Sequence, residues 1–210
     1  DVTNSNMAAP LLARTFGESL LLCSVVSPDG DTTAAPAPPG GGVPVEVTQV
    51  VDRSVPGGLA RAAHAHQAGL VVLGDAPRGP GSVGARLARA SGLPVALAGA
   101  APSGSGPITR VTCAFDAGRR APAVLAAAAD LARRAGAALR LASFGPQRPP
   151  TVPPEAGLDV ERAVVEQWRA QVLTAQRDAL DDLAPGVELA GTLAAVGPTV
   201  EEAVTSVGWD

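Results

Sequence analysis

Few residues in this chain are of a type and spacing that could carry out metal or nucleophilic chemistry. His64 and His66 stand two positions apart in a predicted helix, so they point to different faces and cannot share a metal ion as residues four apart could. Ser24, Ser82 and Ser143 have no neighbouring base and no nucleophile-elbow pattern around them. These patterns predict a protein with no catalytic residues and no metal site.

The two cysteines predict inert thiols. Cys23 and Cys113 each stand inside an apolar run, and neither belongs to a Cys-x-x-Cys pair. Buried free thiols are expected in such positions, rather than a disulfide or a redox pair. A reducing cytoplasm is the compartment that suits them.

Composition excludes several classes of protein. The chain has 210 residues, of which 46% are hydrophobic and 17% charged, which fits one large or two small globular domains. The net charge is −4 and no basic stripe is present, so we expect no nucleic-acid partner. Apolar runs such as Leu20 to Val26 are too short to cross a bilayer, and no secretion-signal pattern is visible, so we expect no membrane partner.

Strand and helix patterns alternate along the chain, and the alternation starts twice. Strands are predicted at 18–26, 43–51, 70–73 and 93–97, and helices at 56–67 and 83–90. After a flexible segment at 100–107, strands are predicted at 108–116, 139–144 and 187–196, and helices at about 122–135, 159–183 and 198–207. This alternation is typical of α/β folds, in which helices cover a parallel sheet.

The two halves repeat one another. ARTFGESLLLCSVV (13–26) corresponds to ARRAGAALRLASFG (132–145), and VEVTQVVDRSVPGGLARAA (45–63) corresponds to VELAGTLAAVGPTVEEAVTS (187–206). Repetition at this length predicts two related domains, 1–99 and 108–210, joined by the linker 100–107.

Both halves resemble the universal stress protein family. LVVLGDAPRGPGSVGARLARASGLPVAL (70–97) is similar to the second half of that domain, and ITRVTCAFD with APAVLAAAADLARRAGAALRLASF is similar to its opening strand, helix and second strand. The resemblance implies open, doubly wound parallel sheets with the strand order 3-2-1-4-5 and a ligand at the carboxyl ends of strands 1 and 4.

By this resemblance each copy is incomplete. The first lacks a strand before Asp1 and a helix between its second and third strands, and the second lacks its last two strands. We therefore expect a diverged tandem protein of which this chain is a part. The alternative is a rearrangement in which the strand at 108–116 completes the sheet of the first copy.

The family pattern also implies a nucleotide site for ATP or AMP, with magnesium. The residues at the matching positions are Gly74, Arg78, Gly79, Gly81, Ser82 and Val83 in a phosphate loop, Asp1 and Val25 beside the adenosine, and Asp116 as the equivalent acid of the second copy. The loop departs from the pattern because it is six residues shorter and contains Pro77 and Pro80, which have no amide hydrogen. Ser82 could instead only cap the following helix, and the acids could be turn residues.

Two functions stay open at this point. The first is a non-catalytic stress-response or regulatory module whose degenerate site binds adenine nucleotide weakly or not at all. The second is a genuine ATP- or AMP-binding protein that uses the Gly74–Val83 loop. An enzyme, such as a slow ATP hydrolase, is disfavoured because no general base is visible. The family's packing habit implies self-association through the strand at 93–97.

Overall fold

The structure, a computed structural model, describes residues 8–29, 42–74, 81–98, 107–147, 158–183 and 185–207. The chain divides into two compact units, Asp1–Pro107 and Ile108–Asp210, and each is described by itself. The division falls at the end of the segment predicted as a linker.

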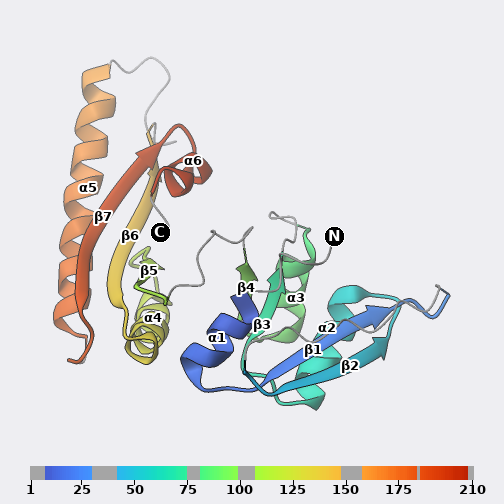
Figure 1. Ribbon diagram of the computed structural model, residues 1–210. Coiled ribbons are helices and arrows are strands. Elements are labelled where there is room, and N and C mark those ends of the chain that lie inside the picture. The colour runs from blue at the N-terminus through green and yellow to red at the C-terminus, as the bar shows by residue number, and fades with distance from the viewer. Residues whose placement is uncertain are drawn as a thin grey trace. The chain divides into compact units, whose positions relative to one another are not determined.

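The first unit contains two separate pairs of parallel strands (Figure 1). Its elements are α1 (Ala8–Phe16), β1 (Leu20–Val26), β2 (Val45–Val51), α2 (Val55–Ala65), β3 (Val71–Gly74), α3 (Val83–Ser91) and β4 (Val95–Ala98). β1 pairs with β2, and β3 pairs with β4. Helix α1 contacts both β1 and β3, whereas α2 and α3 pack against each other.

Glycines bring the helices of this unit close to the strands. A Cβ atom at Gly58 of α2 would lie 2.7 Å from Cγ1 of Val25 in β1, and one at Gly84 of α3 would lie 2.6 Å from Cδ2 of Leu97 in β4. No larger residue fits at either position unless the contact opens, so these glycines set the distance between helix and sheet.

The second unit contains one three-stranded parallel sheet in the order β5-β6-β7. Its elements are β5 (Arg110–Ala114), α4 (Ala121–Ala135), β6 (Ala138–Pro146), α5 (Leu158–Asp181), β7 (Leu189–Gly197) and α6 (Val200–Thr205). Helix α5 runs along one side of β7 and α6 lies on the other side (Figure 1). The sheet is therefore covered on both faces, which explains why no residue of β6 is exposed.

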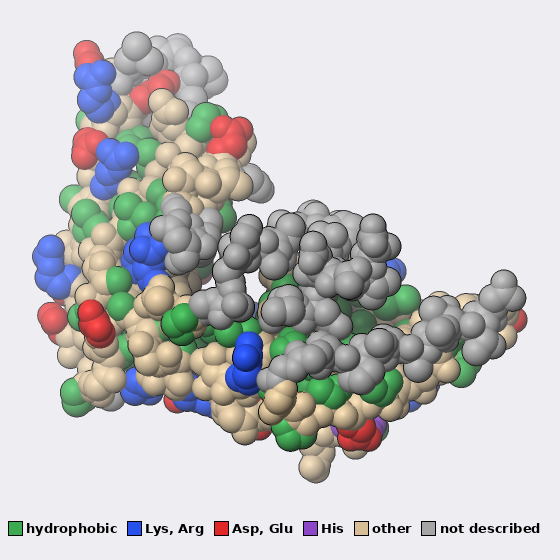
Figure 2. All heavy atoms as spheres, viewed as in Figure 1, with side chains coloured by type: hydrophobic (Ala, Val, Ile, Leu, Met, Phe, Trp, Pro, Cys, Tyr) green, Lys and Arg blue, Asp and Glu red, His purple; other side chains and the backbone are tan. Residues whose placement is uncertain are grey.

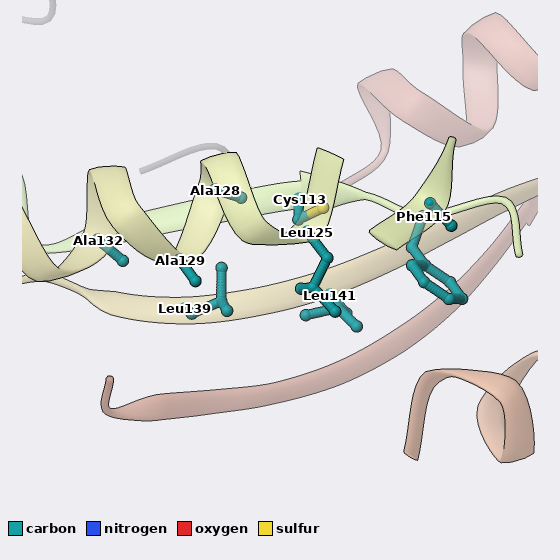
Figure 3. Close-up of a cluster of buried hydrophobic side chains, with 9 residues drawn as sticks. Cys113, Phe115, Leu125, Ala128, Ala129, Ala132, Leu139 and Leu141 are labelled. Atoms are coloured by element: carbon teal, nitrogen blue, oxygen red, sulfur yellow. The ribbon is translucent and has the colours of Figure 1, made fainter. Parts of the chain in front are cut away.

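The core of the second unit lies between α4 and the sheet. Leu139 and Leu141 of β6 are fully buried and face Leu125, Ala129 and Ala132 of α4 (Figure 3). Alanine on the buried stripe of α4 lets the helix approach the leucines closely. The core is thus built from small and branched side chains, in a chain with only 2% aromatic residues.

The order and type of the predicted elements agree with the structure, with differences at specific places. The sequence patterns predict no element before residue 17, but α1 occupies Ala8–Phe16, and Gly17 at its end has φ +67°. The strand predicted at 93–97 is Val95–Ala98, since Pro94 has no amide to donate, although its carbonyl accepts a hydrogen bond from the Val71 amide at 3.0 Å. The strand at 108–116 is the shorter Arg110–Ala114.

The strand neighbours within each unit bear on the predicted sheet order. β5 pairs with β6 of its own unit through one edge, and the alternative in which the strand at 108–116 completes the first copy's sheet stays a prediction. The complete order 3-2-1-4-5 stays a prediction for both units.

The two units share matching local geometry. Gly17 ends α1 with φ +67°, and Gly136 ends α4 with φ +62°. In the first unit the Glu18 amide donates to the Ala13 carbonyl at 2.9 Å, and in the second the Ala137 amide donates to the Ala132 carbonyl at 2.9 Å. This is the hydrogen bond of a helix that ends at a left-handed glycine. The helices that precede β1 and β6 therefore end in the same way.

No helix in the described ranges is long and apolar enough to cross a membrane. On the face drawn in Figure 2, arginine and acidic side chains are scattered among each other and do not gather into a basic patch.

Candidate functional site

The structure places five residues of the predicted nucleotide site in the first unit and one in the second. Val25 lies near the end of β1, Gly74 ends β3, and Gly81, Ser82 and Val83 form the start of α3, whereas Asp116 follows β5. Asp1, Arg78 and Gly79 lie outside the described residues.

Ser82 is the N-cap of α3. Its backbone is extended (φ −60°, ψ 161°), and its Oγ atom accepts a hydrogen bond from the Ala85 amide at 3.2 Å. Gly81, directly before it, has φ +93°, a conformation that glycine adopts far more readily than other residues. The capping role proposed for Ser82 from the sequence is therefore present in the structure.

The start of α3 has the chemistry of an anion site as well as that of a cap. The first amides of a helix have no intrahelical acceptor and carry a partial positive charge, so they can donate to a phosphate oxygen. Because Ser82 uses an oxygen lone pair for its cap, its hydroxyl hydrogen stays available to a ligand. The start of α3 could therefore bind a phosphate, but the helix cap at Ser82 does not require one.

Val25 is engaged in packing. Its two γ-methyl groups lie against Gly58, where a Cβ atom would stand 2.7 and 2.9 Å from them. The side chain therefore packs against α2.

Asp116 has the geometry of a turn residue. It is exposed, and its Oδ1 atom accepts a hydrogen bond from the Gly118 amide at 2.8 Å. Ala117 between them has φ +56°. An aspartate that accepts a hydrogen bond from the amide two residues on is a common way to leave a strand, which agrees with the turn interpretation.

Burial raises the pKa of both cysteine thiols above the usual value. Cys113 is only 3% exposed, and Cys23 is partly buried in β1. Because the neutral thiol is a poor nucleophile, neither residue is set up for catalysis at neutral pH. In the described part of the chain, no three His, Cys, Asp or Glu side chains gather as a metal site would require.

The second unit contains a buried polar network that the sequence patterns did not predict. Gln176 of α5 is fully buried and donates from Nε2 to Ser143 Oγ at 2.9 Å and to the Leu193 carbonyl at 3.0 Å. Ser143 in turn donates to the Phe115 carbonyl. The only hint was a glutamine on the apolar side of a predicted helix.

A cavity of about 490 Å³ lies between α5 and the ends of β6 and β7. It is lined by Gln147, Glu161, Arg162, Val165, Glu166, Arg169 and Val196. Its arginines have acidic partners one helical turn away, with Arg169 bonded to Glu166 at 2.7 Å and Arg162 to Asp159 at 3.4 Å. Paired in this way, they offer little net positive charge to an anionic ligand.

These features define an α/β protein with parallel strands, in which a glycine-containing turn leads from a strand to a capped helix. No family model matches the chain. Over 140 residues it is 31% identical to Universal stress protein Rv2319c of Mycobacterium tuberculosis (strain H37Rv) and to Universal stress protein Mb2346c of Mycobacterium bovis. The match covers 62% of this chain and 47% of each relative, so the chain spans about half the length of the curated relatives.

The similarity predicted from the sequence is therefore confirmed: this chain is related to universal stress proteins. A functionally unknown protein from Pseudomonas aeruginosa, PA1789, has a similar crystal structure, with a TM-score of 0.52 at 15% identity over 91% of this chain and 68% of that one. This second likeness concerns the fold alone.

Proposed function

We propose that the chain is a non-catalytic stress-response or regulatory module of the universal stress protein type, with a nucleotide site that has lost most of its affinity. The observation that carries the role is the 31% identity to two mycobacterial universal stress proteins. The loss of affinity is supported by the start of α3, where the oxygen of Ser82 already serves as the helix cap.

The sequence around the cap supports the same conclusion. Pro77 and Pro80 replace amide donors in a loop that is shorter than the family pattern. Asp116 uses its carboxylate within its own turn. A phosphate at the start of α3 would thus meet few donors.

The alternative is a genuine ATP- or AMP-binding protein. Gly81 with φ +93° supports it, because the exposed backbone of a left-handed glycine can come close to a phosphate. We also propose that the two units are diverged copies of one domain with the family strand order 3-2-1-4-5. Matching glycine-ended helices α1 and α4 support this arrangement.

Isothermal titration of ATP and of AMP, each with magnesium, tests the proposal. We expect no measurable heat, or heat that fits only a weak affinity, from the intact chain. Gly81→Ala changes the loop, and Gly92→Ala is its matched control, because Gly92 at the other end of α3 has φ +65° and equally open surroundings.

Tight binding that Gly81→Ala abolishes and Gly92→Ala preserves would replace the proposal with the nucleotide-binding alternative. Tight nucleotide binding that neither substitution changes would show that the nucleotide binds away from α3. It would also contradict the proposal that the chain has lost most of its affinity for nucleotide. Weak or absent binding in all three proteins supports the proposal.

A further inference from the structure

Ala117 has a backbone conformation that its residue type disfavours. Its φ is +56°, and in the described ranges only one other non-glycine residue, Gln67, has a positive φ. Gln67 lies just after helix α2, a common place for a left-handed residue, whereas Ala117 follows the parallel strand β5. A left-handed alanine costs free energy and persists only where the surrounding structure holds it. The turn at Ala117 therefore needs an anchor.

The anchor lies on the strand side of this turn, at Phe115. Phe115 is only 7% exposed, and its side chain belongs to the core cluster (Figure 3). Its amide donates to the Ala142 carbonyl at 2.8 Å, and its carbonyl accepts a hydrogen bond from the Ser143 hydroxyl. The residue directly before Asp116 is thus fixed to β6 through both of its backbone polar groups.

Gln176 extends the anchor to helix α5. It is fully buried, and its Nε2 atom donates to Ser143 Oγ at 2.9 Å and to the Leu193 carbonyl at 3.0 Å. A serine hydroxyl can rotate, but an amide donor on its oxygen leaves the hydroxyl hydrogen for the Phe115 carbonyl. Helix α5 therefore orients the donor that holds the end of β5.

The helix side of the turn has less support. Arg120, the N-cap of α4, makes no side-chain capping hydrogen bond. The Ala121 amide donates to the Gly118 carbonyl at 2.9 Å, and the Gly118 amide donates to Asp116 Oδ1 at 2.8 Å. These two bonds join neighbouring residues of the turn to one another and do not tie the turn to the sheet. Its position relative to the sheet thus depends on Phe115.

We propose that Gln176 and Ser143 are positioning residues for the turn that carries Asp116. Their hydrogen bonds hold the Phe115 carbonyl, which keeps Ala117 in its left-handed conformation. The exposed Asp116 carboxylate thereby has a fixed place beyond the carboxyl end of β5, the edge at which open α/β sheets bind their ligands. This inference does not depend on nucleotide binding, so it stands under either of the two functions considered above.

Amide exchange of the full chain, measured by NMR, tests the proposal. Ser143→Ala removes the hydroxyl, and we expect exchange of the Gly118 amide to become about tenfold faster because a buried hydrogen bond no longer holds the turn. Cys113→Ala is the matched control, since it trims a buried side chain of β5 and leaves the bond to Phe115 in place. Urea unfolding gives the global stability of each variant. Equal acceleration at Gly118 in the two variants, relative to their global stability, would overturn the proposal.

Ala117→Gly separates positioning of the turn from stability of the unit. Glycine is left-handed without strain, so the turn should no longer need the anchor. In the Ala117→Gly background we expect Ser143→Ala to speed Gly118 exchange by less than about twofold, although it still lowers the urea midpoint. An equally large acceleration in both backgrounds would show that Ser143 does not act through Ala117, and the proposal would fail.

Gln176→Met tests the part of helix α5, because it removes the amide donor and keeps the length of the side chain. We expect it to accelerate Gly118 exchange as Ser143→Ala does, and the double variant to be no faster than Ser143→Ala alone. An unchanged Gly118 exchange rate in Gln176→Met would overturn the role of Gln176.

Discussion

Gln176 donates a hydrogen bond from Nε2 to the Oγ atom of Ser143 at 2.9 Å, in the interior of the second unit. The same amide group donates to the Leu193 carbonyl at 3.0 Å, and Ser143 donates to the Phe115 carbonyl. One residue of α5 therefore links helix α5 to β6 and β7 directly and to β5 through a serine. Buried polar groups of this kind stabilise a structure only while their partners remain.

We predict that Gln176→Ala lowers the free energy of unfolding by about 2–4 kcal/mol, because it leaves Ser143 and the Leu193 carbonyl without a donor and opens a cavity. Urea unfolding measures the change. Gln171→Ala on the exposed side of the same helix is the control and should change stability by less than about 0.5 kcal/mol. Equal effects of the two substitutions would show that the buried network does not stabilise the unit.

Gly145→Ala is predicted to separate α5 from the sheet. A Cβ atom at residue 145 would lie 2.9 Å from Cζ2 of Trp168, so the indole must move, at a cost of about 1–3 kcal/mol. The emission of Trp168, recorded in a Trp209→Phe background, should shift to longer wavelength. Gly69→Ala is the control, because a Cβ atom there meets nothing within 4 Å. An unchanged emission spectrum and stability for Gly145→Ala would contradict the close contact.

Both thiols are predicted to react slowly with iodoacetamide at pH 7. Burial raises the pKa of Cys23 and of Cys113, so the reactive thiolate forms only at a pH above the ordinary thiol value. By the same linkage, the stability contributed by the neutral thiols is present below the unfolded-state pKa and declines as the pH rises toward the folded-state values.

Mass spectrometry of the alkylated chain gives the rate at each cysteine. Cys113 should react more slowly than Cys23, because it is only 3% exposed, and urea should bring both to the rate of a free thiol. Rapid modification of either cysteine in the native chain at pH 7 would contradict the prediction.

The role of Ser82 can be separated into its cap and any contact with a ligand. Ser82→Ala removes the cap and should lower stability by about 1 kcal/mol, whereas Ser82→Asp keeps an oxygen acceptor for the Ala85 amide and should keep stability near that of the unchanged chain. Thermal unfolding measures both. Under the nucleotide-binding alternative, Ser82→Asp would also abolish binding, since its charge repels phosphate; a Ser82→Ala chain of unchanged stability would contradict the cap.

We predict self-association through β4. Within the described residues β4 pairs only with β3, and its Leu97 is 40% exposed. Leu97→Lys places a charge at this edge while its aliphatic stem can still cover Gly84, so it should shift sedimentation toward the monomer. Val51→Lys, at a 62% exposed position of β2, is the control. A monomeric chain at all concentrations, or equal effects of the two substitutions, would contradict an interface at β4.

Much of the fold follows from local patterns that the sequence displays directly. Gly136 stops α4 and Gly92 ends α3, both with positive φ, because a left-handed residue closes a helix at little cost only when it is glycine. Ser82 was recognisable as a cap from its place between Gly81 and the helical pattern. The sequence patterns did not predict helix α1, although Gly17 ends it with the same positive φ.

By itself, the sequence determined the α/β class, the alternation of elements and the relationship to universal stress proteins, since each of these depends on residues close together in the chain. Only the tertiary structure decided that β1 pairs with β2 and β3 with β4, that Gln176 joins Ser143 across 33 positions, and that the buried Oγ atom of Ser24 has no hydrogen-bond partner among the described residues. Such contacts depend on which edges and faces meet in space, and the local preferences of a strand or helix do not specify its neighbour.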